Sequence, residues 1–206
     1  MVLPGVDLLY GRKLRQQRVI LEKIPYFALA LVFGLIAVNA QEATEAIHKD
    51  EEFSFLERLV YASYGFTMYL LKLAWPFDLS AIYPYPYSSG NIPSQYFLFL
   101  AVPVFYVWLF IRFMRSRPLT AAGMYFFAVN IVFLLQILPV GNSVMADRYV
   151  YIPSAGFFLI AGVLYAYIAN RRKLLLRPLQ IGLAVYMLAL GVKTFQRNEV
   201  WESSLA

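Results

Sequence analysis

The sequence predicts an all-α polytopic membrane protein with about five transmembrane helices and one further helix that is re-entrant or interfacial. The first observation is composition: 61% of the 206 residues are hydrophobic, and the mean hydropathy is +0.60. Soluble domains are nearer 45–50% apolar. The second is pattern, because apolar runs of spanning length alternate with short charged turns. The net charge of +6 sits in those turns, which favours a membrane over nucleic acid as partner.

Five apolar runs predict the spanning helices. A helix rises 1.5 Å per residue, so a run of about 17 to 20 residues is just long enough to cross a bilayer core of roughly 30 Å. In chain order, the runs are Ile24–Ala40, Tyr96–Ile111, Leu119–Leu138, Tyr149–Ala169 and the weaker Leu179–Val192.

The segment Phe53–Trp75 is amphipathic and aromatic, and it also carries Glu57, Arg58 and Lys72. Pro76 ends it, since proline cannot continue a helix. The following stretch is rich in proline, tyrosine, serine and glycine, which predicts an ordered loop.

The orientation of the chain depends on whether Phe53–Trp75 crosses the membrane. If it does not, the 18 Lys and Arg residues divide twelve to six between the two sides; if it does, they divide nine to nine. Short cytoplasmic loops collect Lys and Arg, so the uneven split is preferred. We therefore expect the N-terminus in the cytoplasm and the C-terminus outside, in the bacterial inner membrane rather than the endoplasmic reticulum. Six spans remain the alternative.

This topology divides the chain into three parts. Residues 1–23 form a cytoplasmic basic segment, and residues 24–192 form the transmembrane domain. The outer loops of that domain are residues 41–95 and 139–148, and residues 193–206 form an outer-face tail.

Asp147 and Arg148 form the first candidate site. They are the only acid and the only base between Arg117 and Arg171, and they lie between two apolar runs. A charged side chain next to the hydrocarbon core is energetically costly, so it is usually paired, hydrated or part of a functional site. Neighbouring residues on a helix point about 100° apart, so we expect each charge to find its partner elsewhere.

Two interpretations of Asp147, Arg148 and the residues that follow them are open. Pro153 fits the first turn of a helix and places the helix start within residues 149–152. Asp147 would then be an N-terminal cap or a first-turn acid. In the functional interpretation, Arg148 holds an anionic group such as a lipid phosphate. The side chains that would frame this group are Tyr149 and Tyr151.

The second candidate is Lys72 together with the tyrosine–proline loop that contains Tyr83 and Tyr85. Alternating proline and tyrosine makes a stiff aromatic ledge, which suits the headgroup region, sugar rings or isoprenoid tails. Lys72 is a base in an apolar helix and can reach the interface or pair with phosphate.

Other polar groups give weaker signals. Glu42, Glu45 and His48 recur every three residues, but a solvated helix face explains them better than a metal site. Asn130 and Gln136 lie within a span and are expected to bridge helices by hydrogen bonds. No phosphate-cradling glycine loop or nucleophile–base set is present, so the residues predict no catalytic constellation and no cofactor.

Several motifs taken in order resemble a known family. They are Leu21–Phe27, Tyr69–Leu73, Pro76–Ser80 with Tyr83-Pro84, Leu138–Gly141, and Ala146–Gly156. Together they resemble the C-terminal part of the membrane domain of transmembrane and tetratricopeptide-repeat proteins. Those proteins are similar to O-mannosyltransferases of the GT-C fold. The tail at Phe195–Trp201 resembles the lead-in to the repeat domain of that family.

The resemblance implies a polyprenyl-phosphate-linked sugar as donor and a protein acceptor at the outer face. The family's catalytic acid lies in the first outer loop, in an N-terminal half that has no counterpart here, and the repeat domain has none either. We therefore expect a partial glycosyltransferase-like module that binds a polyprenyl-phosphate sugar or other lipid. The alternative is a non-catalytic scaffold subunit of a larger membrane complex, and whether the chain is an enzyme stays open.

Overall fold

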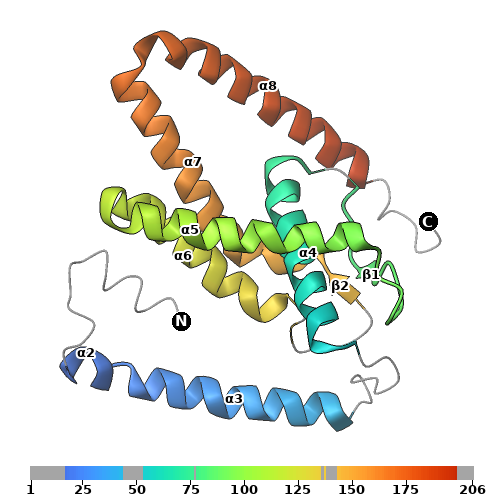
Figure 1. Cartoon of the computed structure of the whole chain (residues 1–206). Helices are drawn as coiled ribbons and strands as arrows, with labels where there is room; N and C mark the ends of the chain where they lie inside the picture. Colours follow the sequence, from blue (N-terminus) through green and yellow to red (C-terminus); the bar gives the residue numbers. More distant parts are fainter. Residues whose placement is uncertain (1–16, 44–52, 77, 136, 138–142, 199–206) are drawn as a thin grey trace. The chain divides into compact units, whose positions relative to one another are not determined.

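The computed structural model describes residues 17–43, 53–76, 78–135, 137 and 143–198. The chain is mostly helical and forms two compact units, Met1–Ile160 and Ala161–Ala206 (Figure 1). Its α-helices are α2 (Gln17–Leu21), α3 (Ile24–Ala43), α4 (Phe55–Ala74), α5 (Ala101–Ser116), α6 (Pro118–Ile131), α7 (Tyr151–Arg171) and α8 (Lys173–Asn198). Its shorter elements are the 3-10 helices η1 (Ser94–Leu100), η2 (Val132–Leu134) and η3 (Asp147–Val150), and the strands β1 (Tyr83–Pro84) and β2 (Ser143–Met145).

Four of the predicted apolar runs lie wholly in helices, whereas the run Leu119–Leu138 is helical only as far as Leu134. Within the described residues, three continuous helical segments are long and apolar enough to cross a membrane, namely Ser94–Ser116, Asp147–Arg171 and Lys173–Gln196. The apolar helices Ile24–Ile36 and Pro118–Leu134 are shorter. These helices are compatible with an integral membrane protein. The count of five spans stays a prediction, because two of the five apolar helices are shorter than a full span.

The loop after α4 differs from the all-α prediction. β1 pairs with β2 in a two-stranded antiparallel ladder, with Tyr83 opposite Met145 and Pro84 opposite Ser143. Strands this short show no alternation of apolar and polar residues, so the sequence offered no periodic signal for them. The ladder joins the loop after α4 to the segment that leads into Asp147.

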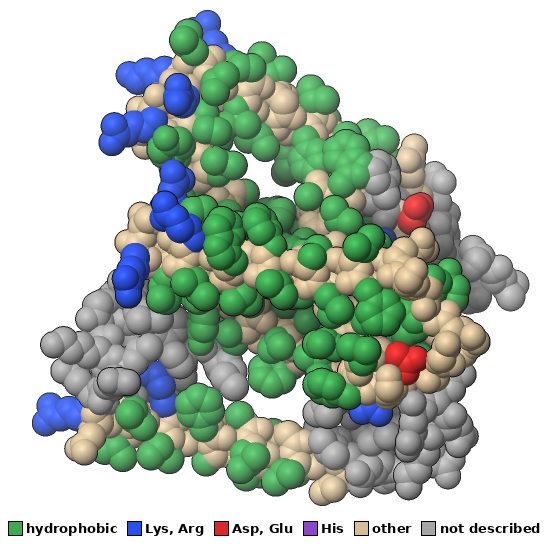
Figure 2. All heavy atoms as spheres, viewed as in Figure 1, with side chains coloured by type: hydrophobic (Ala, Val, Ile, Leu, Met, Phe, Trp, Pro, Cys, Tyr) green, Lys and Arg blue, Asp and Glu red, His purple; other side chains and the backbone are tan. Residues whose placement is uncertain are grey.

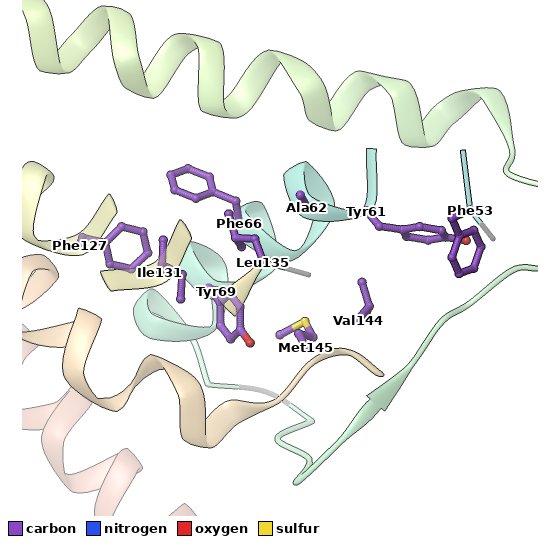
Figure 3. Packing of buried hydrophobic residues seen from close by; sticks show 10 residues of the cluster. All are labelled: Phe53, Tyr61, Ala62, Phe66, Tyr69, Phe127, Ile131, Leu135, Val144 and Met145. Atoms are coloured by element: carbon purple, nitrogen blue, oxygen red, sulfur yellow. The ribbon is translucent and has the colours of Figure 1, made fainter. Parts of the chain in front are cut away.

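Helix α4 lies at the centre of the core of the first unit. The predicted amphipathic helix has no exposed face along its middle, because every residue from Val60 to Tyr69 is buried or half-buried and the exposed residues lie near its two ends. The ring of Phe66 contacts Tyr106 of α5 and Phe127 of α6, at centroid distances of 5.1 and 5.7 Å. Figure 3 shows these inward-facing side chains of α4 beside those of α6 and the β2 strand. The aromatic residues of α4 thus hold α5, α6 and β2 together.

Helices α6 and α7 touch through two glycines. A Cβ added to Gly123 would lie 2.7 Å from the backbone oxygen of Gly156, and one added to Gly156 would lie 2.7 Å from the backbone nitrogen of Phe127. Real Cβ atoms essentially never come that close. Glycines that allow such backbone contact are characteristic of helix packing in membranes.

We predict that Gly156→Ala lowers the free energy of unfolding by about 1–3 kcal/mol, because the new methyl group must push α6 and α7 apart. Thermal unfolding in detergent measures the effect. Gly162→Ala on the same helix is the matched control, since nothing lies within 4 Å of its added Cβ. The free energy of unfolding of this control should rise by up to about 1 kcal/mol, because alanine has a higher helix propensity than glycine. Equal free energies of unfolding for the two variants would contradict the close contact between α6 and α7.

Candidate functional site

The residues between α4 and η1 return along the length of α4. We call residues 78–93 the Tyr-Pro loop. At the end of α4, the Lys72 ammonium donates to the backbone oxygen of Asp78 at 2.9 Å. At the start of α4, Glu57 Oε1 accepts a hydrogen bond from the Gly90 N–H at 2.7 Å. Glu57 and Lys72 are about 22 Å apart along the helix axis at 1.5 Å per residue. Between them, the Tyr61 hydroxyl donates to the backbone oxygen of Tyr87 at 2.7 Å.

Glu57 fastens the loop at the N-terminal end of α4. Its carboxylate also accepts from the Ser54 N–H at 2.7 Å, and Ser54 Oγ in turn accepts from the Glu57 N–H at 3.3 Å, which forms a capping box. Gly90 has a φ of 82°, a left-handed conformation that glycine adopts without steric cost. The hydrogen bond from Gly90 is the largest influence on Glu57, and it lowers the pKa of the carboxyl below its ordinary value.

We predict that Glu57 makes stability depend on pH. A carboxyl with a lowered pKa contributes stability above its unfolded-state pKa, and that stability is lost as the pH falls through the folded-state pKa. Thermal unfolding of the wild type should therefore weaken below about pH 4.5 more steeply than that of Glu57→Gln. The glutamine keeps an acceptor for the cap but cannot titrate. Parallel pH profiles for the two proteins would contradict this role.

Asp147 fastens the loop at the other end. Its Oδ2 accepts hydrogen bonds from the Ser80 N–H at 2.6 Å and from the Tyr83 hydroxyl at 2.9 Å. The Tyr83 oxygen also lies 2.7 Å from the Ser80 nitrogen and 2.8 Å from the Asp78 backbone oxygen. The Tyr83 hydroxyl therefore accepts a hydrogen bond from the Ser80 N–H. Its single proton is shared between the Asp147 carboxylate and the Asp78 backbone oxygen. We call Ser80, Tyr83 and Asp147 the Asp147 clasp.

Tyr69 supports the clasp from the core. Its hydroxyl accepts from the Ala146 N–H at 3.0 Å and lies 3.2 Å from the Ala146 oxygen, to which it donates. Tyr69 is fully buried, so both backbone groups of Ala146 gain a partner away from water. The residue before Asp147 is thereby tied to α4.

The clasp corrects one of the two structural roles predicted for Asp147. Ala146, not Asp147, is the N-cap of η3, and Asp147 lies in the first turn of that 3-10 helix. Its carboxylate faces the Tyr-Pro loop rather than the free N–H groups of a helix. The predicted helix start was right, because α7 begins at Tyr151.

Lys72 contacts the clasp, and Arg148 follows it directly in the chain. The Lys72 ammonium lies 4.6 Å above the centre of the Tyr83 ring, whose hydroxyl bonds Asp147. Arg148 follows Asp147 directly, is exposed, and stacks its guanidinium 5.2 Å from the ring centre of Tyr149. In the described part of the chain Arg148 forms no ion pair, so Asp147 does not neutralise it, as the sequence predicted.

The remaining predicted site residues lie in different surroundings. Tyr85 packs between Phe53 and Tyr61, with ring centroids 4.8 and 5.0 Å away, and burial raises the pKa of its hydroxyl. Tyr149 is half-buried beneath Arg148, whereas Tyr151 is 85% exposed. The structure thus brings Lys72, Tyr83 and Asp147 together, stacks Arg148 on its neighbour Tyr149, and uses Tyr85 for packing.

The weaker polar candidates add nothing to this site. The Asn130 side chain donates to the Phe126 oxygen of its own helix at 2.7 Å and so does not bridge helices through that amide nitrogen. Glu45, His48, Gln136 and the side chain of Glu42 lie outside the described residues. Among the described residues, no three His, Cys, Asp or Glu side chains could share a metal ion.

Ser80, Tyr69 and Glu57 are the site's supporting residues that sequence reasoning did not single out. Glu57 carried one recognisable signal, since Ser54 three residues earlier completes a capping-box pattern. The contacts of Ser80 and Tyr69 with residues 146 and 147 join distant parts of the chain and have no local signature.

We predict that Asp147→Ala lowers the free energy of unfolding by about 1–3 kcal/mol, because the Ser80 N–H loses an acceptor in a half-buried place. Thermal unfolding in detergent measures the loss. Asp147→Asn keeps an oxygen at the same position and should lose less. If both variants unfold as the wild type does, the clasp does not hold the loop.

No family model matches the chain, and neither the curated proteins nor the solved structures contain a match. The class of the protein therefore follows from its own geometry. It is a mostly helical chain whose described residues include three helices long and apolar enough to span a membrane, and its first unit contains a polar clasp.

Proposed function

We propose that this chain is a membrane module that binds a phosphate-linked lipid beside the Asp147 clasp, at the outer face of the membrane. The observation that carries the proposal is a pair of cations: Lys72, whose ammonium lies on the Tyr83 ring of the clasp, and Arg148, which follows Asp147 in the chain. The resemblance noted in the sequence makes a polyprenyl-phosphate-linked sugar the specific ligand.

The position of the site depends on α4, which we propose does not cross the bilayer. The Tyr-Pro loop contacts α4 from Lys72 to Glu57, so a crossing α4 would draw this irregular loop across with it. Much of the loop is exposed, and lipid-exposed irregular backbone does not occur in the hydrocarbon region. The amphipathic α4 and its loop therefore fit the membrane surface, which supports five spans rather than six.

The orientation follows from the charges of α5. Arg112, Arg115 and Arg117 lie at its C-terminal end, where Figure 2 shows basic side chains gathered at one end of the helix. Basic ends of spans lie in the cytoplasm. The opposite end, η1, contacts α4, so α4 and the clasp belong to the outer face.

The chemistry of the site suits a phosphate. Arg148 is exposed and has its guanidinium oriented by the Tyr149 ring, which reduces the freedom lost when it pairs with an oxyanion. Lys72 is half-buried on the ring of Tyr83, so its long stem lies on apolar surface while its ammonium faces polar groups. The carboxylate of Asp147 already accepts two hydrogen bonds, which makes it an organiser of the loop rather than an acid or base.

A scaffold subunit of a larger membrane complex is the second candidate. It is favoured by α8, on which none of the described side chains is buried although the helix is apolar enough to span. The hydrogen bonds of Asp147 are also all internal to the fold. Stable co-purification with other membrane proteins, without lipid-phosphate binding, would favour this function.

The binding proposal is tested with the purified chain in nanodiscs and a long-chain polyprenyl phosphate. We expect Arg148→Ala and Lys72→Met each to weaken binding by at least about tenfold, because each removes a charge-assisted contact. The methionine keeps most of the apolar stem of Lys72. Arg115→Ala is the control at the far end of α5, and polyprenol without phosphate is the control ligand.

Wild-type affinity in both site variants would overturn the proposal, as would equal binding of the phosphate and the free alcohol. Thermal unfolding of each variant separates loss of binding from loss of fold. Arg148 is the sharper probe, because its exposed guanidinium rests on the ring of the neighbouring Tyr149 and takes no part in the hydrogen bonds of the clasp.

A further inference from the structure

The turn between α7 and α8 concentrates positive charge. It carries Arg171, Arg172, Lys173 and Arg177, all exposed. Figure 2 shows these basic side chains gathered where the two helices meet. The turn belongs to the second unit and lies far along the chain from the Asp147 clasp.

No acidic residue offsets this charge within residues 161–198, the part of the second unit that the structure describes. From Arg148 to Asn198 the sequence contains no Asp or Glu. None of the four basic side chains forms an ion pair or a side-chain hydrogen bond within the described part of the chain. Like charges this close repel one another, so a counter-ion from outside the chain is favoured.

The turn lies at a membrane boundary. Asp147–Arg171 and Lys173–Gln196 are both long and apolar enough to span, and Arg172 alone separates them. Pro178 lies inside α8 and has no N–H for the backbone oxygen of Leu174. A backbone oxygen without its helical donor needs another polar partner. The first turn of α8 therefore fits the hydrated headgroup layer.

The same turn also offers apolar contacts. Leu174 and Leu175 are 94% and 54% exposed beside the bases. The Gln180 amide donates to the Tyr165 hydroxyl at 3.1 Å, which ties α8 to α7 near the turn. Exposed leucines next to clustered bases match a ligand with an anionic head and an acyl chain.

We propose that the α7–α8 turn binds the headgroups of anionic diacyl phospholipids in the leaflet that it faces. The four bases contact lipid phosphates, while Leu174 and Leu175 contact the upper acyl chains. This site is separate from the lipid-phosphate site at the Asp147 clasp and does not depend on it.

The test is a lipid titration of the full-length chain in detergent, read by native mass spectrometry, with phosphatidylglycerol and phosphatidylcholine as probes. We expect the wild-type protein to bind phosphatidylglycerol more tightly than phosphatidylcholine. Replacing Arg171, Arg172 and Lys173 together with glutamine should weaken that binding about a hundredfold, since each base near an anionic surface contributes roughly fivefold. The matched control replaces Arg112, Arg115 and Arg117 with glutamine and should bind nearly as wild type does.

Three results would overturn the proposal. The first is unchanged phosphatidylglycerol binding in the α7–α8 variant. The second is an equal loss in the α5–α6 control, which would make net charge the cause. The third is full competition by millimolar inorganic phosphate, which would indicate a free-anion site. Arg148→Ala should retain this binding, so failure here and failure at the clasp can be told apart.

Discussion

The fold of the first unit depends on the attachment of the Tyr-Pro loop to both ends of α4. An irregular segment has no internal hydrogen-bond ladder, so its backbone groups need partners from elsewhere. Glu57 supplies them at one end, and Lys72 with the Asp147 clasp supplies them at the other. The attachment brings β1 against β2 and delivers Asp147 to the loop. It also constrains the membrane position, because loop and helix must share one environment.

Acidic and basic residues have different roles at this site. Asp147 and Glu57 accept hydrogen bonds from the loop and hold its shape. Lys72 and Arg148 rest on tyrosine rings, and the exposed Arg148 meets no acid of the described chain. Cations placed on rings lose little freedom when they meet an oxyanion. This division of roles is the basis of the proposed phosphate-binding site.

Packing among the helices follows two rules. Around α4, large aromatic rings fill the space between helices, as with Phe66 and Phe127. Between α6 and α7, the absence of side chains at Gly123 and Gly156 allows backbone contact. Aromatic packing tolerates small adjustments because rings can tilt, whereas a glycine contact leaves no room for an added atom. The exposed apolar surfaces of α3 and α8 are what a membrane-spanning chain presents to lipid.

The sequence by itself determined the helices and much of their character. Apolar runs located α3 and α5 to α8, Pro76 marked the end of α4, and Pro153 marked the start of α7. These signals are local, because helix periodicity and proline geometry act within a few residues. The adjacency of Asp147 and Arg148 also predicted that these two charges would not pair with each other.

Only the tertiary structure decided what Asp147 contacts. Its bonds to Ser80 and Tyr83 join segments more than sixty positions apart, and no local pattern encodes such a meeting. The same holds for Tyr85, which alternation with proline suggested as a surface ledge but which packs against Phe53 and Tyr61. The direction a loop residue faces depends on where the loop is fastened, and those fastenings are long-range contacts.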